Sequence, residues 1–227
     1  MISKCIALIP CAGSGVRFGS DLPKQYNKIG DRTVLEYTLQ AFIDSELIEQ
    51  ILVVANPTDR IIDKIIDKIA NTKVIVAKIG GESRAETVLN GLNHLGVDKH
   101  DWILVHDAAR CCITTELIGK QIKELNNDLV GGILAIPATD TIKYVNGNVI
   151  EKTLDRTKIF LAQTPQMFRY EILKTALNHA NLELITDEAA AVENLNMEVK
   201  VVNGSINNIK ITIKDDLEQA KLILLER

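Results

Sequence analysis

Residues 5–19 read CIALIPCAGSGVRFG, in which a short apolar run leads directly into a glycine-rich segment. The run is apolar at successive positions rather than at every second one, which is typical of a parallel strand buried on both faces. A glycine-rich turn after such a strand commonly holds phosphate groups through its backbone amides. This stretch therefore predicts an α/β protein with a phosphate-containing ligand beyond the end of its first strand.

Further apolar runs follow along the chain, with helical patterns between them. The runs are ILVVA (51–55), KVIVA (73–77), WILVH (102–106), GGILAI (131–136) and KIFLA (158–162). The helical pattern of residues 59–70 places five isoleucines on one face, namely Ile61, Ile62, Ile65, Ile66 and Ile69. Residues 83–95 open with Ser83 and Glu86 at the spacing of a capping box. This alternation predicts a doubly wound, mostly parallel sheet in a single domain over residues 1–227.

Residues 141–154, TIKYVNGNVIEKTL, break the alternation. They read as two strands around Asn146-Gly147, a dipeptide that favours a type I′ hairpin turn. An isolated hairpin is barely stable in water, so this one should pack on something. It either lies on the edge of its own sheet or forms an arm that embraces a second subunit.

Composition narrows the classes of function. The chain has 227 residues, with 26 basic and 30 acidic side chains and a formal charge of -4, which argues against non-specific nucleic-acid binding. No segment is apolar enough to span a bilayer and the first residues do not read as a signal peptide, so we expect a cytoplasmic protein without membrane contact. The four cysteines lack metal-finger spacing and are expected to be reduced thiols.

The glycine-rich segment does not fit the common nucleotide motifs. The dinucleotide fingerprint G-x-G-x-x-G matches at Gly13 and Gly15, but its third position is Phe18, and Gly19 comes one residue late. Pro23 would then interrupt a helix that began in the loop. The motif G-x-x-x-x-G-K-[ST] is absent as well. A nicotinamide-dependent enzyme is therefore disfavoured.

Two positive charges distinguish the loop, Arg17 within it and Lys24 after it. A triphosphate suits two cations, because it carries more charge than a dinucleotide pyrophosphate and its bridging oxygen gains charge as pyrophosphate leaves. The alternative is a solvated loop in which the basic residues are incidental.

The segment IPCAGSGVRFG…LPKQY closely resembles the signature loop of cytidylyltransferases that act on sugar-alcohol phosphates. Within them, it is most similar to the 2-C-methyl-D-erythritol 4-phosphate cytidylyltransferase family of the non-mevalonate isoprenoid pathway. The resemblance covers nearly the whole chain, and eight blocks in order make it specific. The other blocks are GGESRAETV (80–88), VHDAAR (105–110), DTIK (140–143), LDR (154–156), AQTPQMF (162–168), TDEAAAVE (186–193) and NNIKIT (207–212).

The resemblance implies a Rossmann-like nucleotidyltransferase fold and transfer of a cytidylyl group from CTP to the sugar-alcohol phosphate. It also implies a homodimer, with residues 138–157 as the arm, and Mg²⁺ bound mainly through the CTP phosphates rather than by protein ligands. The expected catalytic residues are Arg17, Lys24, Arg156 and Lys210. The expected nucleotide-binding residues are Ala12, Gly13, Ser14, Gly15, Gly81, Glu82, Thr87, Asp107 and Arg110. The expected substrate-binding residues are Asp107, Arg110, Asp140, Thr141, Lys143, Arg156, Thr164, Thr186 and Lys210.

Several of these residues also have simpler interpretations. Asp107 could cap a helix and pair with Arg110, Arg84 could only decorate a helix surface, and Arg156 could form a surface salt bridge. His106 is expected to be a buried strand residue rather than a base, because attack by an ionised phosphate removes no proton. Cys11, where the family usually has alanine, would place an oxidation-sensitive thiol beside the nucleotide.

Three other functions compete with this interpretation. A related family that uses ribitol 5-phosphate tends to carry L-A-G-G and D-S-V-R where this chain has PCAG and DAAR. An NAD-dependent oxidoreductase is disfavoured by the missing third glycine. A non-catalytic nucleotide-binding regulator is disfavoured because both loop cations and both substrate-side cations are present.

Overall fold

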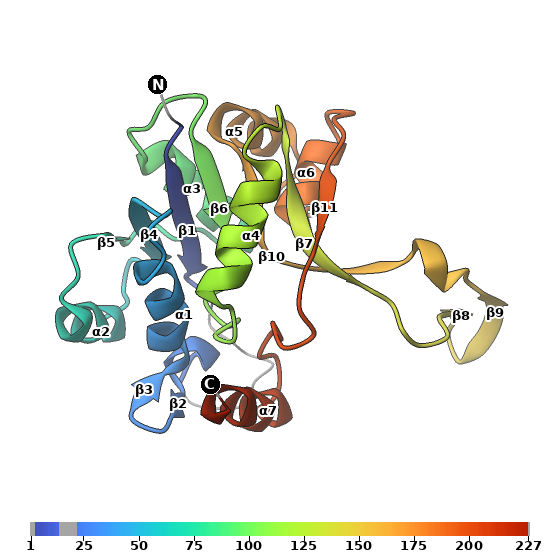
Figure 1. Ribbon diagram of the computed structural model, residues 1–227, viewed down its shortest axis with the longest axis horizontal. Coiled ribbons are helices and arrows are strands. Elements are labelled where there is room, and N and C mark those ends of the chain that lie inside the picture. Colours follow the sequence, from blue (N-terminus) through green and yellow to red (C-terminus); the bar gives the residue numbers. More distant parts are fainter. Residues whose placement is uncertain (1–2, 14–21, 227) are drawn as a thin grey trace.

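Seven segments of the chain form the strands of one central sheet. The computed structural model describes residues 3–13 and 22–226. The strands are β1 (Cys5–Cys11), β4 (Gln50–Ala55), β5 (Val74–Ala77), β6 (Trp102–Val105), β7 (Gly131–Pro137), β10 (Phe160–Arg169) and β11 (Lys200–Asn203). Their order is β5-β4-β1-β6-β10-β7-β11 (Figure 1). All run in the same direction except β10, which is antiparallel to both β6 and β7. The predicted mostly parallel sheet is confirmed.

Helices cover both faces of this sheet. Helices α1 (Val34–Ile43), α2 (Ile61–Ile69) and α4 (Thr115–Leu125) pack on one face, and α3 (Arg84–His94), α5 (Tyr170–His179) and α6 (Glu188–Glu193) pack on the other. Alternate side chains of β1 serve the two layers, since Ala7 and Ile9 join the first cluster and Ile6 and Leu8 join the second. Successive side chains of a strand point to opposite faces, so only a run that is apolar throughout can bury both. This explains the pattern of residues 5–9.

The predicted isoleucine face of α2 is confirmed. Ile62 and Ile65 are buried, while Ile61, Ile66 and Ile69 are half-buried against the same cluster.

A third apolar cluster supports the loops beyond the carboxyl ends of the strands. The last helix, α7 (Lys214–Leu225), packs there against the short hairpin β2 (Lys28–Ile29) and β3 (Arg32–Thr33), with Ile29, Ile211 and Ala220 buried in the contact. Among the described residues, no helix is long and apolar enough to cross a membrane.

The expectation for residues 158–162 was wrong in two respects. Phe160, Leu161 and Ala162 are the exposed beginning of β10, and the buried part of this strand is residues 163–168. The strand is also antiparallel, with an irregularity in its pairing to β7 between Ala162 and Gln166. Pro165 lies in this interval and has no amide hydrogen for the ladder. The irregularity matters for function because it places Thr164 beside the end of β6.

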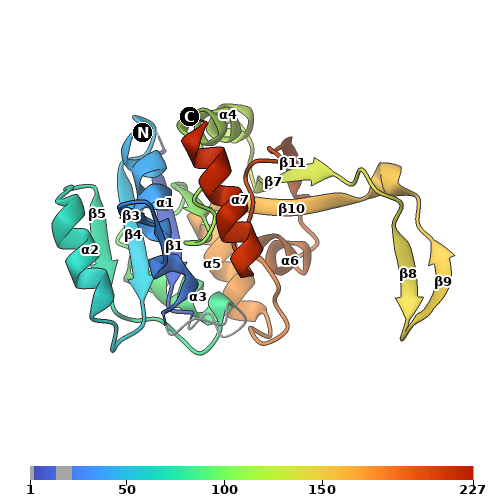
Figure 2. The same ribbon diagram turned by 90° about the horizontal axis from the view of Figure 1, so that it is seen from below.

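The hairpin forms a separate two-stranded sheet, β8 (Lys143–Asn146) and β9 (Val149–Thr153), and does not join the edge of the central sheet. Figures 1 and 2 both show it standing away from the body of the molecule. Asn146 pairs with Val149, so the turn residues are Gly147 and Asn148 rather than Asn146 and Gly147. Gly147 has a φ of 57°, and Asn148 is not among the residues with positive φ. A positive φ at the first central position alone is the requirement of a type II′ turn, which corrects the type I′ prediction.

Candidate active site

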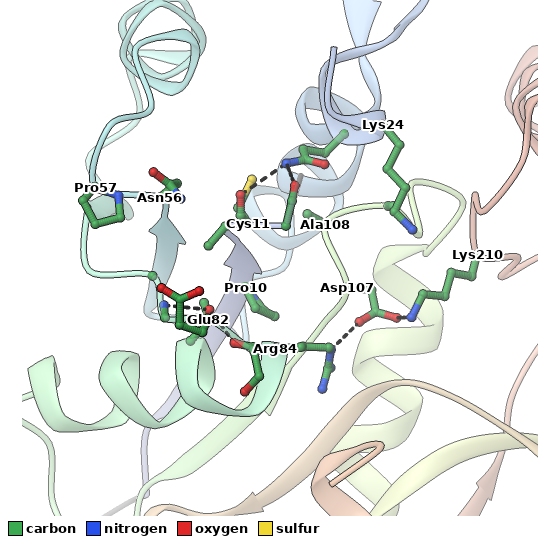
Figure 3. Close-up of a pocket in the computed structure, with 18 of the residues that line it drawn as sticks. Pro10, Cys11, Lys24, Asn56, Pro57, Glu82, Arg84, Asp107, Ala108 and Lys210 are labelled. Carbon is green, nitrogen blue, oxygen red and sulfur yellow. Dashed lines mark hydrogen bonds and ion pairs between the residues drawn. The ribbon is translucent and has the colours of Figure 1, made fainter. Parts of the chain in front are cut away.

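A pocket of about 720 Å³ opens at the carboxyl ends of β1, β4 and β6, the edge at which parallel sheets bind ligands (Figure 3). The ends of three strands and the start of α3 supply its wall. The described lining residues are Pro10, Cys11, Ala12, Gly13, Lys24, Gln25, Asn56, Pro57, Thr58, Gly80, Gly81, Glu82, Ser83, Arg84, Thr87, Asp107, Ala108, Ala109, Lys210 and Thr212.

The beginning of the glycine-rich loop forms one side of this pocket. The buried side-chain amide of Gln25 donates to the carbonyl oxygens of Cys11 and Gly13, each at 3.2 Å, and so ties both ends of this stretch to the turn at Lys24–Tyr26. A Cβ at Gly80 would lie 2.3 Å from the Cβ of Ala12, so only glycine fits there. Of the residues expected in this segment to bind or act on the nucleotide, Ala12, Gly13 and Lys24 line the pocket. The predicted residues Ser14, Gly15 and Arg17 lie outside the described residues.

Asp107, which follows β6, is the acidic residue that cations of the pocket contact. Its carboxylate contacts the Arg84 side chain at 2.9 Å, Lys210 Nζ at 2.9 Å and Arg110 Nε at 3.4 Å. Burial by itself would raise the pKa of Asp107, but the charges of Arg84, Lys210 and Arg110 outweigh burial and hold the pKa well below its usual range. Asp107 therefore stays ionised at neutral pH, and it holds three cations close to one another.

Arg84 does not merely decorate a helix surface, the alternative that the sequence left open for it. It lines the pocket, and it joins Asp107 to Glu188, the first residue of α6. Its Nη1 and Nη2 atoms lie 2.6 and 3.1 Å from the two carboxylate oxygens of Glu188. Burial would lower the pKa of Arg84, but Glu188 and Asp107 more than offset this and raise it.

Glu188 is a functional candidate that the sequence did not reveal. It is 1% exposed although it is charged. Acidic residues are common in the first turn of a helix, where the helix dipole favours them in solvent. Nothing in TDEAAAVE separates Glu188 from that ordinary class.

The start of α3 forms the wall opposite Asp107. Ser83 Oγ accepts a hydrogen bond from the Glu86 amide, but the Glu86 carboxylate accepts from the Glu82 amide rather than from that of Ser83. Only one half of the predicted capping box is therefore formed. The Gly81 amide donates to Thr87 Oγ1 at 3.1 Å, which holds two of the expected nucleotide-binding residues against each other.

The loop after β4 contributes three lining residues that were not predicted, Asn56, Pro57 and Thr58. The rule that ligands lie beyond the carboxyl ends of parallel strands would have found them, because they directly follow the apolar run 51–55.

Other predicted residues lie behind the pocket or away from it. Arg110 is beneath Asp107, with Nη1 donating to the Asn208 carbonyl at 2.8 Å. Thr164 is 4% exposed and accepts a hydrogen bond from the Asp107 amide at 3.1 Å, so it contacts the loop rather than the cavity. Thr186 is exposed, just before α6.

The remaining predicted residues lie on the arm, and none of these lines the pocket of its own chain. They are Asp140, Thr141, Lys143 and Arg156, all exposed. The Arg156 guanidinium donates to the Thr139 carbonyl, and Lys143 Nζ lies 2.8 Å from Thr153 Oγ1. Arg156 is therefore held within the arm rather than by a salt bridge.

The expectation that Cys11 is sensitive to oxidation is not supported. The side chain is 2% exposed, and burial raises its pKa to about 12, whereas thiol reactivity requires an accessible thiolate. Over the described parts of the chain, no group of three His, Cys, Asp or Glu residues could hold a metal ion.

Comparisons with known proteins identify the family of the chain. Residues 5–226 match the model of the family IspD, 2-C-methyl-D-erythritol 4-phosphate cytidylyltransferase. A protein of that name from Neisseria meningitidis serogroup B is 46% identical over 99% of both chains. A crystal structure of the enzyme of that name from Francisella tularensis superimposes with a TM-score of 0.82, with 37% identity over 97% of this chain and 100% of that one. A 4-diphosphocytidyl-2C-methyl-D-erythritol synthase gives a TM-score of 0.87 with 41% identity over 99% of both chains. This chain therefore belongs to the 2-C-methyl-D-erythritol 4-phosphate cytidylyltransferase family.

Proposed function

We propose that this chain transfers the cytidylyl group of CTP to 2-C-methyl-D-erythritol 4-phosphate, giving 4-diphosphocytidyl-2-C-methyl-D-erythritol and pyrophosphate. The observation that carries the proposal is the placement of Lys24, Arg84 and Lys210 around one pocket at the carboxyl edge of the sheet. Figure 3 shows the side chains of Lys24 and Lys210 at the Asp107 end of this pocket. Three cations at one edge suit a ligand with several phosphate groups.

In the reaction, a phosphate oxygen of the sugar alcohol attacks the α-phosphorus of CTP in line, and the bond to the departing pyrophosphate breaks. Lys24 and Arg17 stabilise the negative charge that develops on the transferring and leaving groups. Lys210 and Arg156 orient the attacking phosphate. The contact of Lys210 with Asp107 limits the positions that its ammonium group adopts.

The nucleotide occupies the opposite part of the pocket. The wall formed by Gly81, Glu82 and Thr87 faces the base, and the loop beginning at Ala12 and Gly13, with Ser14 and Gly15, follows the phosphates. Asp107 serves the ribose and the incoming phosphate, and Arg110 contributes to the same site from behind through its contact with Asp107. The substrate phosphate is already ionised, so the reaction needs no base. The burial of His106 behind the pocket is consistent with this.

Magnesium enters the proposal as a partner of CTP rather than as a resident ion. The described residues hold no carboxylate cluster for a metal, and Asp107 is already in contact with three cations. Mg²⁺ binds largely through phosphates and water, and it supplies charge neutralisation at the triphosphate when bound. The free thiols of the chain suit a reducing compartment, so we place the reaction in the cytoplasm.

We also propose that the protein is a homodimer in which residues 138–157 of one chain reach the pocket of the other. The arm exposes apolar side chains, with Val149 at 69% and Ile150 at 59% exposure, and such groups favour burial against a partner. Its polar residues Asp140, Thr141, Lys143 and Arg156, together with Thr186, complete the substrate site in this proposal, while the buried Thr164 supports the site from behind through its hydrogen bond with the Asp107 amide.

A mixing experiment tests the shared pocket. Arg156→Ala and Lys210→Ala homodimers are each expected to be nearly inactive. If the pocket takes Lys210 from one chain and Arg156 from the other, a mixed dimer has one intact pocket. Random exchange of equal amounts should then restore about a quarter of wild-type turnover. Absence of recovery, with exchange verified by a tagged chain, would place both residues in the pocket of a single chain.

The reaction itself is tested by pyrophosphate release with CTP and Mg²⁺, comparing 2-C-methyl-D-erythritol 4-phosphate with ribitol 5-phosphate. Release with the erythritol phosphate alone is expected. Release with ribitol phosphate instead would keep the chemistry and change the substrate, and release with neither would favour a nucleotide-binding regulator. Lys24→Ala should reduce turnover by roughly a hundredfold, whereas Lys221→Ala, on the outer surface of α7, should not.

A further inference from the structure

His106 is a buried polar residue to which the proposed reaction gives no role. It is 0% exposed and directly follows β6, immediately before Asp107. Its Nδ1 lies 3.0 Å from Thr164 Oγ1, and its Nε2 lies 3.1 Å from the carbonyl oxygen of Arg110. The ring packs against Phe42 of α1, with 5.1 Å between ring centroids. Both ring nitrogens are therefore hydrogen-bonded, one to the far end of the segment 106–110 and the other to β10.

The hydrogens in this chain of contacts can be assigned one at a time. A carbonyl oxygen only accepts, so the bond to Arg110 requires a hydrogen on Nε2. The Asp107 amide donates to Thr164 Oγ1 at 3.1 Å, which leaves the single hydroxyl hydrogen of Thr164 to be donated elsewhere. Nδ1 is its acceptor at 3.0 Å. With Nδ1 as acceptor and Nε2 as donor, His106 is neutral with its hydrogen on Nε2, and every hydrogen in this chain of contacts has an acceptor.

The surroundings of the ring favour this neutral form. Burial lowers the pKa of His106 to about 4, even though the charge of Asp107 opposes this effect. The charged groups that act on the ring are Asp107, Arg110 and Arg84. Phe42 and Thr164 pack against it from α1 and β10 and do not titrate in the physiological range.

The contacts of His106 bind the two ends of a short segment that carries two site residues. The Arg110 amide donates to the Asp107 carbonyl at 3.0 Å. Nε2 of His106 forms a second hydrogen bond within the segment, to the Arg110 carbonyl. Thr164 then ties this unit to β10. Displacement of the segment would move the carboxylate of Asp107 and with it the contacts to Arg84 and Lys210.

We propose that His106 is a positioning residue, neutral with its hydrogen on Nε2, that holds Asp107 and Arg110 in place for nucleotide and phosphate binding. This deepens the proposed function and rests on it for the identity of the ligands. The hydrogen-bond assignment concerns the protein alone and can be tested without any reaction.

The first test is ¹⁵N NMR of wild-type protein with labelled histidine. The expected result is an Nε2-protonated, neutral ring for His106 that does not titrate between pH 5.5 and 8.5. A hydrogen on Nδ1, or titration within that range, would overturn the proposal, whatever the enzyme turns over. Failure of the proposed function would instead appear as absence of pyrophosphate release with an unchanged spectrum.

The second test uses three substitutions of His106. His106→Gln keeps a donor close to the position of Nε2, His106→Asn keeps an acceptor close to that of Nδ1, and His106→Leu keeps neither. We expect His106→Leu to raise the Kd for CTP by about tenfold or more, and His106→Gln to recover most of this loss, because the link to Arg110 is retained. Equal CTP affinity in all three variants, or recovery by His106→Asn alone, would contradict the positioning role. The measurement is isothermal titration calorimetry on variants whose circular dichroism matches the wild type.

Discussion

The ion pair between Arg84 and Glu188 offers the sharpest energetic test of the site. Glu188→Gln keeps the shape of the side chain and removes its charge. The Glu188 side chain is 1% exposed, and its contacts with Arg84 are 2.6 and 3.1 Å long. Removing one partner of a buried ion pair costs about 3–5 kcal/mol, because the other charge is left without compensation. Arg84 keeps Asp107 as a partner and is 28% exposed, so we expect the lower end, about 3 kcal/mol.

The measurements are urea unfolding for the free energy of unfolding and thermal unfolding for the Tm, both at pH 7.5 and followed by circular dichroism. For a chain of this length, about 3 kcal/mol corresponds to a decrease in Tm of roughly 6–12 °C. Asp63→Asn is a matched control, because its pair with Lys78 is also 2.6 Å long but is 34% and 53% exposed. An exposed pair contributes about 0.5 kcal/mol. If Glu188→Gln costs no more than Asp63→Asn, burial of the pair does not stabilise the site as we argue.

Three further predictions concern other buried groups. Burial lowers the pKa of His106 from 6.5 to about 4. The contribution of the neutral ring to the free energy of unfolding is therefore complete above pH 6.5 and falls by about 3 kcal/mol as the pH drops towards 4. Urea unfolding of His106→Gln at pH 7.5 and at pH 4 should show no such loss from residue 106. Gly80→Ala should lower the free energy of unfolding by about 1–3 kcal/mol, because its Cβ would lie 2.3 Å from that of Ala12, whereas Gly96→Ala meets no atom within 4 Å and should be nearly neutral. The thiol of Cys11 is buried and has a pKa of about 12, so it should resist alkylation by iodoacetamide at pH 7.5 and react only in urea. Peptide mass mapping locates the modified cysteines. Rapid modification of Cys11 in the native protein would contradict its burial.

The position of the pocket could be predicted because its determinants are local. The run CIALI, the glycines that follow it and the charged residues after 102–106 each mark the carboxyl end of a strand. In parallel sheets these ends share one edge. Lys24 and Asp107 were therefore expected near the same ligand, and both line the pocket.

The direction of β10 could not be predicted in the same way. An apolar run indicates burial, but it carries no information about which strands pair with it or in which direction. The pairing of β10 with β6 and β7 joins segments far apart in the chain. The prediction for the hairpin contains a smaller error of the same kind. The Asn-Gly dipeptide located the turn to within one residue, but the pairing of Asn146 with Val149 makes Gly147 and Asn148 the turn residues.

What the sequence determined by itself was the alternation of strands and helices, the edge of the sheet at which the pocket lies and the family, because these follow from short-range periodicity and from motifs that are contiguous in the chain. Only the tertiary structure decided how the charges are paired. Arg84 and Glu188 are 104 residues apart in the sequence and meet because α3 and α6 pack on the same face of the sheet. Their burial turns two ordinary helix residues into a paired support for the wall of the pocket, because a charge removed from water must have its partner within contact distance.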